Sequence, residues 1–333
     1  MKAALLLALA GVAHAAVDGT VVNGSAGKPQ AGVTVTLVSM SGSGMQPQGS
    51  VQTDAQGSFR FDQTPAGPAL IQAAHQGVSY SLVWQPGSPV SGLKLEVYDT
   101  SPEPGSAKAV QDIVLLEPSA NRLSIRETVI WQNGGKTTYS NPASGTLRIH
   151  VPPEGKDSLR VSVTPPGGLP LEQSASAAGP QDVYKVDFPI KPGETSFEVS
   201  YQVPFSSPGV FSGRSLQKDA PLRLVVPHGV VLTGDGLESL GQEPQSQASI
   251  YGAKGPEYRV EIQGMAVAPT GGGGEDSSSG LNQILPRVYD NAYTIVGLSL
   301  AILALGFVLL YRTRKAPVVP AQAPPSPRSK RQR

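Results

Sequence analysis

The residue types that most often perform catalysis are sparse in this sequence. Cysteine is absent, which excludes thiolate nucleophiles, thiolate metal sites and disulfides. Histidine occurs at His14, His75, His150 and His228, and none of them stands in an H-x-x-E or H-E-x-x-H motif. The G-x-S-x-G and G-x-x-x-x-G-K-[ST] motifs are also missing. The sequence therefore predicts no catalytic residue, no metal and no cofactor, and we expect a protein that is not an enzyme.

Glu127 has an unusual position within its segment. Residues 123–131 alternate between apolar and polar side chains, which predicts a strand with one buried face. The alternation that buries Leu123, Ile125 and Val129 also places Glu127 on the buried face. Such a carboxylate costs several kcal/mol unless it is paired, so either a β-bulge turns it away or a partner such as an arginine meets it. We favour this structural interpretation; the alternative is a ligand contact, which makes Glu127 the candidate ligand-binding residue.

Two of the histidines are expected at the surface. His150 shares the parity of Arg148, whereas Leu147 and Ile149 occupy the opposite face of the same predicted strand. His228 stands in a Pro-His-Gly turn. Both side chains should therefore point toward solvent.

Strands are the elements that must position these side chains. Alternation with a period of two recurs along the central chain, for example over 33–37, 58–61, 184–188 and 197–203. Segments rich in Gly, Pro, Asn and Asp separate the alternating stretches. This pattern predicts an all-β fold of two tandem β-sandwich domains, followed by one C-terminal transmembrane helix.

The two ends of the chain predict its location. Lys2, an apolar stretch and Ala13-His14-Ala15 have the form of a secretory signal peptide with its cleavage site. Residues 292–311 contain no charge and span about 30 Å as a helix, which matches a bilayer. Seven cations and no acid follow this span, so the positive-inside rule places the tail in the cytoplasm. We expect a single-pass protein of the cell membrane whose bulk lies outside the cytoplasm, in the periplasm or at the surface.

Composition divides the chain further. Residues 101–106 and the Gly- and Ser-rich stretch that begins at 268 have the character of linkers. The predicted order is a signal peptide (1–15), a first sandwich (16–100), a linker (101–106), a second sandwich (107–267), a stalk (268–291), a transmembrane helix (292–311) and a basic, proline-rich tail (312–333). Within the helix, Gly297 and Ala301 have a small-xxx-small spacing, which predicts a weak homodimer contact.

Residues 17–99 resemble the carboxypeptidase regulatory-like domain, a transthyretin-like β-sandwich. The resemblance lies in three stretches: 19–21, then 27–37 with Pro29 and Gly32 at a turn, then 53–61 with Asp54 and Gly57 at another turn. It implies an accessory, non-catalytic module beside other domains. Asp54 should bond its own backbone in its turn, and calcium binding is the alternative.

The expected function is non-catalytic. The formal net charge of +1 excludes a generally basic nucleic-acid binder. We expect a membrane-anchored envelope protein that displays its sandwiches as binding or scaffolding modules to an unknown envelope protein or glycan. The alternatives are a subunit of a membrane assembly or signalling complex that contacts partners through helix and tail, and, less favoured, an enzyme with an unrecognised hydrolase site.

Overall fold

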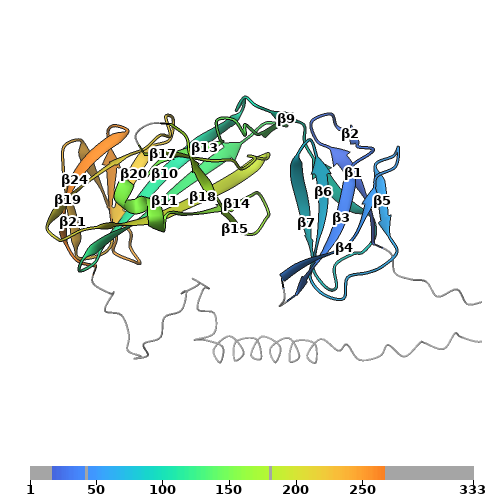
Figure 1. Cartoon of the computed structure of the whole chain (residues 1–333), viewed down its shortest axis with the longest axis horizontal. Coiled ribbons are helices and arrows are strands. Elements are labelled where there is room, and N and C mark those ends of the chain that lie inside the picture. The colour runs from blue at the N-terminus through green and yellow to red at the C-terminus, as the bar shows by residue number, and fades with distance from the viewer. Residues whose placement is uncertain (1–16, 42–43, 180–181, 267–333) are drawn as a thin grey trace, which may run out of the picture. The chain divides into compact units, whose positions relative to one another are not determined.

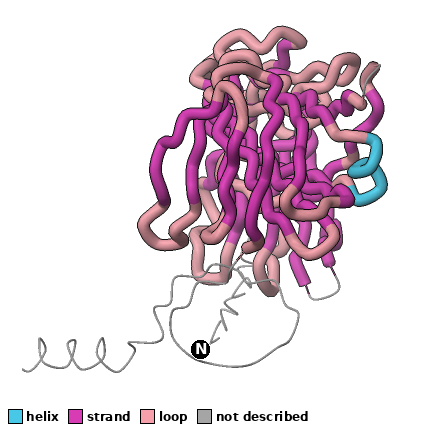
Figure 2. The backbone as a smooth tube through the Cα atoms, turned by 90° about the vertical axis from the view of Figure 1, so that its left-hand side faces the viewer, coloured by secondary structure: helices cyan, strands magenta, loops and turns pink. Residues whose placement is uncertain are grey.

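The computed structural model describes residues 17–41, 44–179 and 182–266, all of which belong to one compact unit. This part of the chain consists of strands and a single short 3-10 helix (Figure 2), which confirms the all-β prediction. Within these ranges no helix combines the length and the apolar character needed to cross a membrane. The predicted signal peptide, the predicted stalk from residue 268, the transmembrane helix with Gly297 and Ala301, and the basic tail lie outside the described residues.

Two sheets with one shared core form the first sandwich (Figure 1). One sheet has the strand order β2–β1–β5, with β8 parallel to β1, and the other has the order β4–β3–β6–β7. Phe59, Phe61, Leu37, Ile71 and Trp84 are among the side chains that fill the space between them. The strands are β1 (Val17–Asn23), β2 (Lys28–Pro29), β3 (Thr34–Ser41), β4 (Gly44–Gln52), β5 (Ser58–Phe61), β6 (Ala69–His75), β7 (Val78–Trp84) and β8 (Leu93–Val97).

The turn before β5 has the predicted form. Oδ1 of Asp54 accepts hydrogen bonds from the backbone N–H groups of Gln56 (2.9 Å) and Ser58 (2.8 Å). Gly57 has a φ of +74°, and a Cβ at this position would lie 2.6 Å from the carbonyl oxygen of Val21. Glycine is therefore required here both by the backbone conformation and by the close approach of β1.

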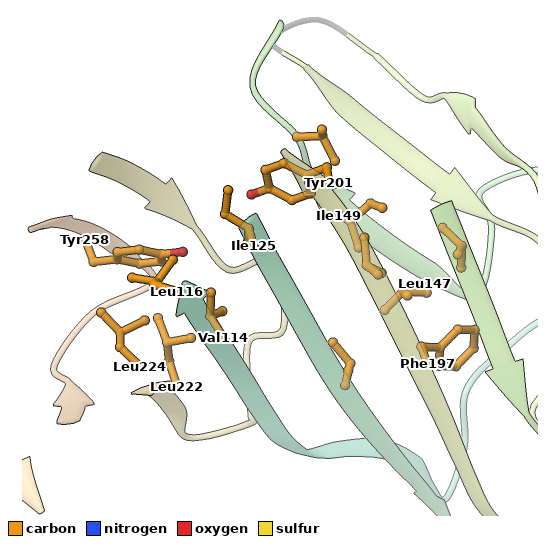
Figure 3. Packing of buried hydrophobic residues seen from close by; sticks show 14 of the residues in the cluster. Val114, Leu116, Ile125, Leu147, Ile149, Phe197, Tyr201, Leu222, Leu224 and Tyr258 are labelled. Atoms are coloured by element: carbon orange, nitrogen blue, oxygen red, sulfur yellow. The ribbon is translucent and has the colours of Figure 1, made fainter. Parts of the chain in front are cut away.

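The second sandwich has an eight-stranded sheet with the order β15–β14–β18–β11–β10–β20–β23–β22. Two three-stranded sheets, β13–β17–β16 and β19–β24–β21, contribute side chains to the same core (Figure 3). Phe197, Leu116, Ile125 and Leu224 are among its fully or almost fully buried members. The elements are β10 (Ala107–Pro118), β11 (Arg122–Asn133), β13 (Leu147–His150), η1 (Pro153–Ser158), β14 (Arg160–Thr164), β15 (Leu171–Gln173), β16 (Ala175–Ala177), β17 (Val183–Val186), β18 (Gly193–Pro204), β19 (Gly209–Arg214), β20 (Leu222–Val226), β21 (Val230–Thr233), β22 (Leu237–Gln242), β23 (Ser249–Ala253) and β24 (Glu257–Gly264).

Hydrogen bonds connect the two sandwiches. The short strand β9 (Thr100–Ser101) pairs in parallel with β12 (Thr138–Tyr139), so the predicted linker begins inside a strand pairing. The Tyr80 hydroxyl is hydrogen-bonded to Oγ1 of Thr138 (2.7 Å), and that contact is buried. The junction is therefore built from both backbone and side-chain contacts.

Candidate functional site

Glu127 points into the core of the second sandwich, as its parity predicted. It lies on β11 opposite Val114 of β10 and Val199 of β18, and it is 5% exposed. No β-bulge turns Glu127 away, because β11 has no register shift at this residue. Its partner is a second carboxyl group, that of Asp112, rather than an arginine. A solute therefore cannot reach Glu127 unless the sandwich opens.

A β-bulge turns Asp112 toward Glu127. The register of β10 against β11 shifts between Ala109 and Gln111. Before the shift the odd positions of β10 are buried, and after it the even positions Asp112 and Val114 are buried. The extra residue of the bulge thus reverses the parity of the strand and leaves Asp112 fully buried. The sequence analysis did not identify Asp112, because a bulge of this kind leaves no simple alternation to follow.

One serine hydroxyl contacts the carboxylate pair, and two buried tyrosines share its core. The hydroxyl of Ser215 donates a hydrogen bond to Oδ2 of Asp112. Tyr201 of β18 and Tyr258 of β24 belong to the same core, and the charge of Glu127 raises the pKa of both hydroxyls in addition to the larger effect of burial. Figure 3 shows both tyrosines among the buried side chains of this core.

Burial favours protonation of the pair. Desolvation raises the pKa of Asp112 to about 6, and burial together with the charge of Asp112 raises the pKa of Glu127 well above its usual range. Oδ1 of Asp112 has no hydrogen-bond partner other than the neighbouring carboxyl group among the described residues. Two neighbouring buried carboxylates titrate as a pair, and their simultaneous ionisation is disfavoured.

A polar groove on β19 and β24 contains the half-buried His150. It has a volume of about 820 Å³, and Arg214 and Glu257 form an ion pair of 3.7 Å on its wall. Nδ1 of His150 is buried without a hydrogen-bond partner, and burial lowers the pKa of this side chain. His150 lies on the same side of β13 as the exposed Arg148, as predicted, but its side chain is half-buried because residues of β19 and β24 lie beside it. The described residues contain no group of three or more His, Cys, Asp or Glu side chains that could hold a metal ion.

An exposed edge strand borders the first sandwich. β4 pairs with β3 on one side and is the last strand of its sheet. Eight of its nine residues are exposed, none carries a charge, and Met45 is 57% exposed. Pro47 removes one backbone donor, and a register shift occurs opposite Leu37 and Val38. These two features limit indiscriminate strand pairing and still leave backbone groups at both ends of β4.

A cleft of about 500 Å³ lies where β3, β6 and β7 of the first sandwich meet loops of the second. We call it the cleft; its lining residues are Met40, Ser41, Gly44, Met45, Leu70, Gln72, Gly77, Val78, Ser79, Ser81, Val83, Pro165, Pro166, Gly167, Gly168, Leu169, Pro170, Leu171, Phe188, Pro189 and Lys191. Lys191 is the charged member of this lining. The sequence analysis missed the cleft, because 165–168 and 191–193 carry only turn signals.

Comparisons with known proteins give one family. Residues 16–90 match the carboxypeptidase regulatory-like domain, in agreement with the resemblance found in the sequence. A comparison with curated proteins found no match. Among solved structures, a mutant of an M1 zinc metallopeptidase from Deinococcus radiodurans is similar at 12% identity, 47% coverage of this chain, 42% coverage of that chain and a TM-score of 0.27. The present chain thus spans less than half of that protein, and at this score the likeness carries no functional argument.

Proposed function

We propose that this chain is a non-catalytic, membrane-anchored envelope protein that presents its sandwiches to another envelope component outside the cytoplasm. The uncharged segment 292–311 and the cationic tail support the anchoring and its orientation. The regulatory-like domain at residues 16–90 supports the accessory role.

The edge strand β4 is the observation that carries the binding role. Its exposed, uncharged residues can accept an extended segment of a partner protein, since a sheet edge offers unpaired backbone donors and acceptors. Tethering to one membrane would raise the effective concentration of such a partner, so a modest contact suffices. A glycan partner is the second candidate of the same class, and a protein segment is favoured because β4 offers backbone groups rather than an aromatic platform.

Site-specific photo-crosslinking in native membranes tests this role. A photo-reactive amino acid at Gln46 of β4 should give a discrete adduct that mass spectrometry identifies, whereas the same residue at Gln56, in an exposed turn, should not. The variant Gln46→Lys should abolish the partner contact, because an edge lysine opposes strand addition, and Gln56→Lys is its matched control. Equal adducts at both positions, or a contact that survives Gln46→Lys, would refute the role of β4.

A further inference from the structure

The floor of the cleft is the outer face of the sheet, which points away from the core of the first sandwich. On this face Leu70 of β6 and Val83 of β7 lie side by side in register, and the polar side chains of Gln72, Ser79 and Ser81 share the lining. Leu70 is 9% exposed although it does not belong to the core between the two sheets. This part of the outer face is therefore covered, whereas the outer face of an antiparallel sandwich is normally polar and open to solvent.

The opposite wall is apolar but incompletely covered. It is formed by the loop that carries Leu169, by Leu171 at the start of β15, and by Phe188. Leu169 is 55% exposed and Leu171 is 39% exposed, and Met45 is similarly open at the same cleft. Large apolar side chains that remain open around a cavity of this size are typical of a small-molecule site.

Lys191 supplies the charge complementarity. Its Nζ atom donates a hydrogen bond to the carbonyl oxygen of Ser79 and lies 5.0 Å from the centre of the Tyr80 ring. No ion pair within the described residues includes Lys191. Burial lowers the pKa of this ammonium group to about 8. The site thus has one partly buried cation without an acidic partner, beside an apolar surface.

We propose that the cleft binds a long-chain fatty acid, whose hydrocarbon chain lies on the outer face of β3, β6 and β7 and whose carboxylate pairs with Lys191. The single cation of the lining favours one anionic group, and the Met, Leu, Val, Pro and Phe side chains of the lining favour an apolar chain. An extended peptide fits this site less well. The backbone groups of β3 and β6 are already used by neighbouring strands, so a sheet face offers a peptide backbone few partners. The cleft borders β4 through Gly44 and Met45, and the fatty acid proposed for it differs in chemical class from the protein segment proposed for β4.

Photo-labelling of the full chain in native membranes tests the proposal. The probe is a palmitate analogue that carries a diazirine in its chain and a terminal alkyne, and the comparison probe is the corresponding alcohol. We expect labelling of the tryptic peptide 161–185, displaced by unlabelled palmitate. The alcohol should label this peptide about tenfold less, because it lacks the charge-assisted contact. That comparison uses the native chain, so it does not depend on the folding of a variant.

Two variants sharpen the result. Lys191→Gln should reduce labelling of peptide 161–185 by the carboxylate probe about tenfold and leave labelling by the alcohol unchanged. Ser81→Trp should block both probes by filling the cleft. Lys108→Gln, on the exposed side of β10, is the matched control for Lys191→Gln. Equal labelling by both probes, or labelling confined to residues 292–311, would overturn the proposal, since either result describes simple partition into the bilayer.

Discussion

Replacing Glu127 by glutamine should stabilise the second sandwich at neutral pH. Because folding raises the pKa of Glu127, ionisation of this side chain costs more free energy in the folded chain than in the unfolded chain. Above the unfolded pKa of about 4.3, each unit by which folding raises the pKa costs about 1.36 kcal/mol of stability. A glutamine amide needs no proton uptake and can still donate a hydrogen bond to Asp112.

The sign of the pH dependence follows from the same shift. The folded pKa values of Glu127 and Asp112 are both raised, so the stability associated with the pair is fully present below about pH 4. This stability is lost as the pH rises through the pKa values of the folded state. The folded pKa is about 6 for Asp112 and is raised well above its usual range for Glu127. Glu127→Gln should therefore raise the melting temperature at pH 7, by about 2–4 °C for each kcal/mol gained, and change it little at pH 4.

Tryptophan fluorescence can follow the second sandwich alone. The chain has two tryptophans, Trp84 in the first sandwich and Trp131 on β11. In a Trp84→Phe background, the fluorescence emission of Trp131 reports thermal unfolding of the second sandwich, which contains Glu127. Glu194→Gln, at an exposed position of β18, is the control for the loss of a carboxylate. A melting temperature for Glu127→Gln that is unchanged or lower at pH 7 would contradict the raised pKa of Glu127 in the folded chain.

Three further changes test other parts of the structure. Ser215→Ala removes the hydroxyl that donates to Asp112 and should cost about 1–3 kcal/mol by chemical denaturation, because a buried acceptor loses its partner. Gly57→Ala should lower the melting temperature of the first sandwich, since its Cβ would approach a backbone oxygen of β1; calorimetry that shows no change would contradict the described turn. Tyr80→Phe removes a hydroxyl bonded at 2.7 Å across the junction and should increase amide exchange around Thr138, where unchanged exchange would show that the bond contributes nothing.

Periodicity was sufficient to predict the fold class and the inward orientation of Glu127. A period of two is a local property, so it predicted the all-β character and the inward parity of β11. The backbone hydrogen bonds of the Asp54 side chain were also predicted, since an Asx turn depends on residues close together in the sequence.

The features that the sequence did not predict depend on contacts between distant residues or on an irregularity within one strand. Asp112 becomes buried through a bulge, and one inserted residue inverts a strand without altering composition. For Glu127 either a β-bulge or a partner such as an arginine was expected, whereas its neighbour in the structure is the carboxyl group of Asp112, and burial raises the pKa of Glu127. Lys191 and Leu70 both line the cleft although about 120 residues separate them in the sequence. The local turn signals around Lys191 do not predict that these two residues lie at one site.

The topology of the chain is the central claim, and single-cysteine labelling tests it most directly. The sequence has no cysteine, so Gln56→Cys and Ser326→Cys each introduce one unique thiol. In spheroplasts treated with a membrane-impermeant maleimide, we predict that the cysteine at position 56 reacts at once and that the cysteine at position 326 reacts only after lysis. Labelling in the opposite order would place the sandwiches in the cytoplasm and contradict the account.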